Sequence, residues 1–233
     1  MAPNPNPPGD PGFPHPPYPP FPPYPVCTRG PVGPPGPPGP SGPAGSMNNT
    51  ATCFVYAQLA HLLEQLIVLY PATTLYVFLS GFDPWVFTGL PYQLYQSAEG
   101  TYGGLFILDN AGEYIAIPLS AIAALQFETG AVYNPAITYL SEPAFPPGCD
   151  TNQVTAIHDY VGTLTGDYEF DFESHVWSTG PVYKNEYGMV VQADVSGNDP
   201  AFLPTTHIIA IYPLPAAKSA EAEAGTMRVK GKE

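Results

Sequence analysis

The chain has 233 residues, of which 33 are proline, and its formal net charge is −14. Most of the prolines precede residue 47, and the remainder is long and apolar enough to bury a hydrophobic core. Only six residues are Lys or Arg, and Lys184 alone lies between residues 30 and 217. Because so acidic a body repels phosphate backbones and anionic lipid, the composition argues against nucleic-acid and membrane-surface partners. No apolar run is long enough to predict membrane insertion.

Glycine recurs at every third position of the Pro-rich segment between residues 30 and 45. This is the spacing of collagen, because only glycine fits where three polyproline II chains meet at one axis. An isolated chain gains nothing from the spacing, so we expect a homotrimer. The glycines of the predicted triple helix are Gly30, Gly33, Gly36, Gly39, Gly42 and Gly45.

The same register continues toward the N-terminus with aromatic residues in place of glycine, at His15, Tyr18, Phe21 and Tyr24. Polyproline II has three residues per turn, so these side chains form a stripe on one face of an extended arm, which from residue 9 to residue 45 would span roughly 115 Å. We predict that the stripe docks on a neighbouring subunit or packs in a wider bundle. A disordered linker, or a ligand for a proline-recognising domain, are the alternatives.

Residues 47–140 combine one helical pattern with several strand patterns. Helix-capping residues at 48–52 precede an apolar periodicity that stops at Pro71, which predicts an amphipathic helix of about four turns. Residues with alternating polarity and high β-propensity then follow. The predicted strand segments are 74–79, 85–97, 105–108 and 114–127, the last broken at Pro118.

One helix followed by about five short strands predicts a small SH3-like or Sm-like barrel, and therefore a mainly β fold. The segment YIAIPLSAIAAL at 114–125 resembles the closing strands of Sm-like domains. The segment LLEQLIVLYPATTLYVFLSG at 62–81, placed after Gly-Pro triplets, resembles collagen-like proteins of the spore surface of spore-forming bacteria. That resemblance covers residues 30–127. It implies a protein of the exosporium or a spore appendage, deposited from the mother cell without a classical signal peptide.

The second half of the chain contains an imperfect copy of the first. The residues Tyr102-Gly103 and Asp109 match Tyr187-Gly188 and Asp194, and the residues 117–122 match 203–208 at an offset of 85 to 86. We therefore expect two tandem barrels, the second degenerate and without a leading helix. The predicted divisions are a Pro/aromatic arm at 1–29, a collagen-like segment at 30–46, a helix with the first barrel at 47–140, a linker at 141–150, the second barrel at 151–217 and a flexible tail at 218–233.

The strand DYEFDFE at 167–173 alternates strictly between aromatic residues and carboxylates. Its carboxylates could face a Ca²⁺ ion, but side chains two apart on a flat strand do not wrap a cation as a ligand loop does, so a solvated acidic face is the preferred interpretation. The five histidines are scattered, and no catalytic or phosphate-binding motif is found. The sequence therefore predicts no enzyme, no cofactor and no metal site.

The three cysteines lie in different predicted segments, and we expect different roles for them. Cys27 lies directly before the collagen-like segment and Cys149 lies in the predicted linker, so both are candidates for intermolecular disulfides. Cys53 opens the predicted helix and is expected to be buried as a small apolar residue.

These features together predict a structural protein that self-assembles through homotrimers into an extracellular filament or spore-surface layer, with itself and possible spore-coat proteins as partners. The alternative is a trimeric adhesin or ligand-binding module on a collagen-like stalk. Because exposed edge strands tend to pair, three chains with two barrels each also suggest a pseudo-hexameric ring.

Overall fold

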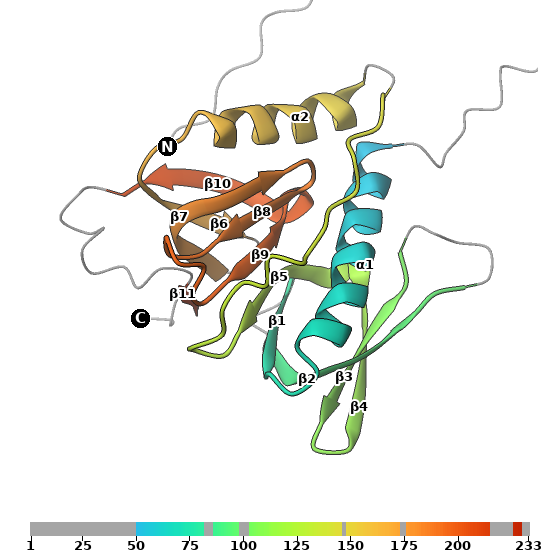
Figure 1. The fold of residues 1–233 in the computed structure, drawn as a ribbon. Coiled ribbons are helices and arrows are strands. Elements are labelled where there is room, and N and C mark those ends of the chain that lie inside the picture. The colour runs from blue at the N-terminus through green and yellow to red at the C-terminus, as the bar shows by residue number, and fades with distance from the viewer. Residues whose placement is uncertain are drawn as a thin grey trace, which may run out of the picture. The chain divides into compact units, whose positions relative to one another are not determined.

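The computed structural model describes residues 50–81, 86–97, 103–145, 148–172, 176–214 and 226–229, all within one compact unit, Gly45–Glu233. The predicted triple-helix glycines, the aromatic stripe at 15–24 and Cys27 lie outside the described residues. The described part is mainly β, as predicted, with an antiparallel sheet of 11 strands and helices packed against it (Figure 1).

Two stretches of the chain have the same order of elements, and we call them the first repeat (residues 51–127) and the second repeat (residues 149–213). The first contains α1 (Ala51–Leu69), β1 (Leu75–Leu79), β2 (Val86–Tyr95), β3 (Leu105–Asn110), β4 (Glu113–Pro118), the 3₁₀ turn η1 (Leu119–Ala121) and β5 (Ile122–Phe127). The second contains α2 (Cys149–Gly162), β6 (Asp167–Phe172), β7 (Val176–Glu186), β8 (Met189–Gln192), β9 (Ala201–Pro204), η3 (Thr205–His207) and β10 (Ile208–Pro213). A further strand, β11 (Thr226–Val229), follows.

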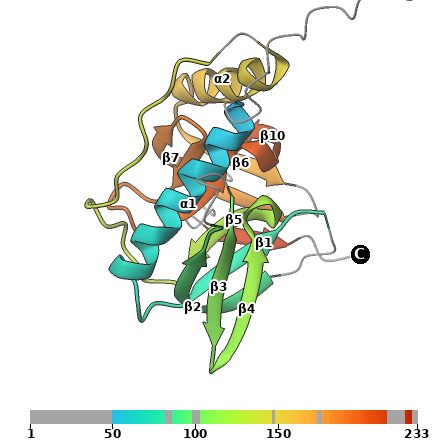
Figure 2. The ribbon, with the colours of Figure 1, turned by 90° about the vertical axis from the view of Figure 1, so that its right-hand side faces the viewer.

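Strand pairing follows one path, β10-β6-β7-β8-β9-β5-β1-β2-β3-β4. Within each repeat the fifth strand pairs with the first, and the first four strands pair in chain order. The repeats meet where β9 pairs with β5, and β4 and β10 are left at opposite ends of the path (Figures 1 and 2).

The predicted first helix is confirmed, and its ends have local causes. The Thr50 hydroxyl accepts a hydrogen bond from the Cys53 amide at 3.1 Å, which caps the N-terminus. The helix stops at Leu69 because the residue before Pro71 cannot comfortably continue it. Its length and apolar character would allow it to cross a membrane, but nine of its residues are already buried by this fold.

The predicted strands of the first repeat are also confirmed, including the break at Pro118, after which η1 separates β4 from β5. The alternating strand of the second repeat is confirmed as β6. Its Tyr168, Phe170 and Phe172 are buried, whereas the acidic residues between them are half-buried.

Two predictions about the second half are wrong. Its repeat does begin with a helix, α2, which starts at Cys149 inside the predicted linker. Val154 and Val161 are buried at helical spacing, and Ile157 packs against the core of the second repeat. The tail, predicted to be a frayed helix or disordered, forms β11 at Thr226–Val229, where it pairs antiparallel with the first part of β7.

The strand register corrects the sequence alignment of the two repeats. Leu105 pairs with Pro118 and Met189 pairs with Pro204, so Leu105 corresponds to Met189, at an offset of 84 residues instead of 85 or 86. The loop from β8 to β9 is longer than the turn from β3 to β4, which is why a single offset fails. From Pro118 and Pro204 onward the offset is 86 residues.

Candidate assembly interface

The joint between the repeats is an antiparallel strand contact. Leu125 of β5 lies opposite Phe202 of β9, and Gln126 lies opposite Ala201. Because the strands belong to different repeats, this pairing turns two small sheets into one. The joint is therefore an example, within one chain, of how one repeat of this fold attaches to another.

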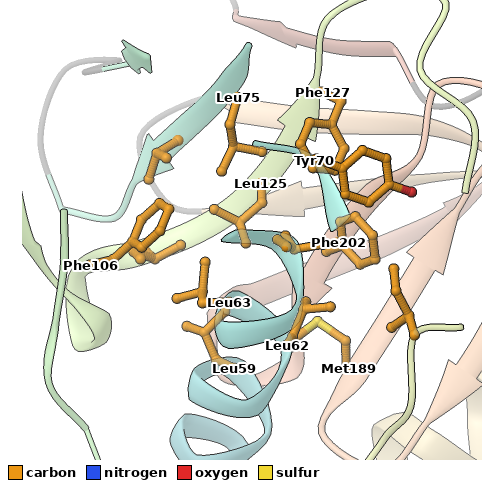
Figure 3. Packing of buried hydrophobic residues seen from close by; sticks show 14 of the residues in the cluster. Leu59, Leu62, Leu63, Tyr70, Leu75, Phe106, Leu125, Phe127, Met189 and Phe202 are labelled. Atoms are coloured by element: carbon orange, nitrogen blue, oxygen red, sulfur yellow. The ribbon is translucent and has the colours of Figure 1, made fainter. Parts of the chain in front are cut away.

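Apolar side chains of the second repeat enter the core of the first at this joint. Met189, Val191 and Phe202 are fully buried in the cluster that contains the α1 leucines. Figure 3 shows Met189 beside Leu62, and Phe202 on the same side of the cluster as Phe127. The ring centroids of Phe202 and Phe127 are 6.4 Å apart in an edge-to-face arrangement. The repeats are therefore joined both by strand pairing and by a shared hydrophobic core.

Conversely, Phe78, Ala123 and Ala124 of the first repeat are buried in the second cluster, with Phe170 and Val190. Each core therefore contains residues from both repeats. Every residue of β8 (MVVQ) and β9 (AFLP) is buried. The sequence signal for this is that apolar residues follow one another in both strands and do not alternate with polar ones. Continuous apolar strands of this kind are typical of sheets covered on both faces.

The turn before β8 lies directly against α1. Gly188 has φ +84°, and a Cβ atom added there would lie 3.0 Å from Cγ2 of Val55. The neighbouring Tyr187 ring lies 5.7 Å from the Phe54 ring, centroid to centroid. Glycine is required here for two reasons, a left-handed backbone and a close approach to a helix.

The loop from β8 to β9 is fastened to the segment that follows β5. The Tyr133 amide donates to the Gly197 carbonyl at 2.7 Å, and the Asp199 amide donates to the Ala131 carbonyl at 2.8 Å. Asp194 organises the loop internally, since hydrogen bonds from Asn198, and also from Ser196, lower the pKa of its carboxyl. The loop therefore holds β9 in position beside β5.

Lys184 of β7 lies over the same segment. The Lys184 ammonium lies 5.1 Å from the centroid of the Tyr133 ring and 5.8 Å from that of Tyr139. The two tyrosine hydroxyls are 3.2 Å apart, and burial raises the pKa of Tyr139. These cation–π contacts hold β7 against this segment.

The corresponding surface of the second repeat is open. Strand β5 is buried at five of its six positions, whereas β10, its counterpart, is buried only at Ile208. The contrast is largest at one pair of equivalent positions, since Ala123 is 0% exposed and Ile209 is 63% exposed. The difference arises because β9 and β8 cover the first repeat and nothing in the described chain covers the second.

A groove of about 420 Å³ runs along this open surface, between α2 and β10. It is lined by Gln153, Ala156, Ile157 and Tyr160 of the helix and by 208–211 of the strand. None of these residues is charged. A shallow, uncharged groove beside an unpaired strand edge suits another strand better than a small polar ligand.

The other free edge of the sheet is β4. It is joined to β3 by a tight turn in which Ala111 and Gly112 both have positive φ, and the Gly112 amide donates to Asp109 Oδ1 at 2.7 Å. Tyr114 is exposed on this strand, and its ring lies 4.6 Å from that of Tyr92. The β3–β4 hairpin thus presents a regular apolar edge.

Of the predicted site residues, the structure places only Cys149. It is exposed, in the first turn of α2, and not in the predicted linker. The next residue, Asp150, accepts hydrogen bonds from the amide (3.0 Å) and the hydroxyl of Thr52, so the N-termini of α1 and α2 lie together. Cys53 is half-buried nearby on α1, less enclosed than predicted. Within the described ranges no three His, Cys, Asp or Glu residues are grouped to hold a metal ion.

The searches of family models, curated proteins and solved structures found no match to this chain.

Proposed function

We propose that this chain is a structural protein that assembles with copies of itself into trimers, and then into an extracellular fibre or spore-surface layer. The observation that carries the proposal is the unequal burial of equivalent strands. Strand β5 is covered by a repeat of the same chain, whereas β10 lies uncovered beside an apolar groove. An exposed apolar edge of this kind is an aggregation hazard in a monomer and an attachment point in an assembly.

Two further features support it. Each repeat has a helix, five strands in the pairing order fifth-first-second-third-fourth, and a 3₁₀ turn before the last strand, as an Sm-like barrel would require. The Gly-X-Y tract that precedes α1 in the sequence has the spacing that a three-chain contact requires. In this proposal the arm sets the number of chains and the barrels provide the lateral contacts.

Electron microscopy of the purified full-length protein tests the assembly. We expect regular filaments or sheets. Dispersed lollipop-shaped trimers would instead support a trimeric adhesin on a collagen-like stalk, and monomers would contradict both functions.

The triple helix is tested by Gly36→Ala, with Ser41→Ala as the matched control. Both variants add an alanine to the tract, but only the first places a Cβ atom at the crowded axis. Arg29 is the only Lys or Arg before Lys184, so tryptic cleavage after it reports on this region alone. We expect Gly36→Ala to raise the cleavage rate several-fold and Ser41→Ala to leave it unchanged. Equal rates for the three proteins would contradict a triple helix.

Cys27 and Cys149 are proposed to form disulfides between chains once the protein has left the reducing cytosol. The exposed position of Cys149 supports its part in this. We expect oxidised protein to give disulfide-linked dimers and larger species on a non-reducing gel. The double variant Cys27→Ser, Cys149→Ser should lose them, whereas Cys53→Ser should keep them. Persistence of the ladder in the double variant would remove these cysteines from the proposal.

A further inference from the structure

We propose that β4 of one chain pairs antiparallel with β10 of a second copy, that the β3–β4 hairpin fills the groove between α2 and β10, and that three chains close into a ring of six repeats. The inference rests on the proposed self-assembly and specifies its contact. It follows from comparing each free edge of the sheet with its counterpart in the joint between the repeats.

The receiving side is the counterpart of a surface that is already occupied. In the first repeat, α1 and β5 hold Met189, Val191 and Phe202 of the second repeat. In the second repeat, α2 and β10 form the uncharged groove and leave Ile209 exposed. The surface formed by α1 and β5 is therefore occupied within the chain, whereas the equivalent surface formed by α2 and β10 is not.

The inserting side is the counterpart of the strands that fill it. Strands β4 and β9 both end in a proline and are followed by a 3₁₀ turn, and equivalent backbone hydrogen bonds hold the two turns. The Leu119 amide donates to the Gly104 carbonyl and the Thr205 amide to the Gly188 carbonyl, each at 3.1 Å. The β3–β4 hairpin therefore has the backbone needed to repeat the contact made by β8 and β9.

The side chains that the hairpin would insert are only partly enclosed, since Leu105 and Ile107 are half-buried and Ala116 is exposed. Leu105 and Ile107 correspond to Met189 and Val191, and they lie outside the buried cluster of their own repeat. Ala116 corresponds to Phe202 and is exposed. The three side chains are apolar and available to a neighbour.

Charge does not oppose the contact. Strand β10, with the sequence IIAIYP, contains no ionisable side chain other than Tyr212, and β4 carries one carboxylate, Glu113 at its start. Neither edge has the lysines that commonly keep strand edges from pairing. In a chain with a net charge of −14, two edges that together carry a single carboxylate are surfaces where copies can approach closely.

The joint also fixes the expected register. Within the chain, Leu125 pairs with Phe202. The equivalent of Leu125 in the second repeat is Ile211, and the equivalent of Phe202 in the first repeat is Ala116. We therefore expect Ile211 of one chain to lie opposite Ala116 of the next. The pairing of Gln126 with Ala201 likewise becomes Tyr212 opposite Ile115. A head-to-tail contact of this kind gives either a closed ring or an open filament. The collagen-like tract joins three chains, which favours closure at three.

Cysteine cross-linking of the full-length chain tests both register and closure. In a background with Cys27, Cys53 and Cys149 changed to Ser, two designs place cysteines at predicted partners: Ile211→Cys with Ala116→Cys, and Tyr212→Cys with Ile115→Cys. One of the two is the closer, non-hydrogen-bonded kind of pair, which suits a disulfide. The matched control, Ile211→Cys with Glu113→Cys, is out of register on the same strand.

On a non-reducing denaturing gel we expect an in-register design to give a ladder that ends at the trimer, and the control to stay at least tenfold weaker. Equal cross-linking of the control, or none in either in-register design, would overturn the pairing. A ladder continuing beyond the trimer would overturn closure of the ring.

Ile209→Asp provides a second test, with Val195→Asp as its control. Both side chains are largely exposed, at 63% and 94%, so neither change should prevent folding. Ile209 lies in the predicted contact and Val195 lies in the loop before β9. We expect Ile209→Asp to reduce in-register cross-linking at least tenfold and Val195→Asp to leave it unchanged; equal yields from the two variants would overturn the contact.

The native mass of the cysteine-free chain separates the two proposals. A trimer that gives no in-register cross-link would contradict the strand pairing and leave self-assembly intact. A monomer would contradict both.

Discussion

Replacing Phe202 with alanine is expected to lower the free energy of unfolding by about 3–5 kcal/mol. The side chain is fully buried and packs beside Phe127 and Tyr133, with centroid distances of 6.4 and 6.2 Å. Its loss leaves a cavity at the point where the two repeats share a core, and close-packed neighbours fill such a cavity only partly. Urea unfolding at one fixed protein concentration measures the change, because assembly makes stability depend on concentration.

Tyr95→Ala is the control for this experiment, since it removes an aromatic ring that is 56% exposed on β2. We expect it to change stability by less than about 0.5 kcal/mol. We also expect Phe202→Ala to keep a single unfolding transition, because each core contains residues of both repeats. Two separate transitions in the parent protein would show that the repeats unfold independently, and would contradict a shared core.

Gly188→Ala is expected to cost more stability than Gly81→Ala, although the two glycines have nearly the same backbone, with φ of +84° and +87°. An alanine in this left-handed region costs about 1–2 kcal/mol at either position. At Gly81 the new Cβ atom meets nothing within 4 Å, whereas at Gly188 it meets Val55 of α1. Crowding of a packed contact adds roughly 1–3 kcal/mol.

The difference between the two variants therefore measures how closely the second repeat approaches α1. Urea unfolding of both proteins gives it directly. Equal destabilisation would mean that the turn before β8 can move away from the helix without loss, and that the joint is looser than described.

Elements with strong local signals could be predicted from the sequence. The first helix has a capping residue before it and a proline after it, and its apolar positions follow the helical period. Strand β6 alternates without interruption, and Pro118 marks the end of β4. In each case a few neighbouring residues decide the backbone conformation.

Helix α2 was missed because its local signal is weak. Only Val154 and Val161 are buried on it, and the Pro-Pro-Gly run before Cys149 is typical of a linker. The helix is held by contacts from distant parts of the chain, among them Asp150 with Thr52 and the Asn185 side-chain amide with the His158 carbonyl at 2.8 Å. Strand β11 was missed for a similar reason, since its pairing with β7 joins distant segments.

The sequence by itself determined that the described body is mainly β, that a helix precedes its first strands, and that its second half repeats its first. These properties follow from local propensity and from internal similarity, and both can be recognised in the amino-acid sequence without a structure. The triplet arm, the disulfides and self-assembly stay predictions.

Only the tertiary structure decided that β9 pairs with β5 and that β10 is left open. Edge pairing depends on backbone N–H and C=O groups that every residue except proline has, so the side-chain pattern does not say which edges meet. Nor does it show that Ala123 is covered while the equivalent Ile209 is exposed. That difference between two copies of one fold turns a general expectation of self-association into a contact with a defined register.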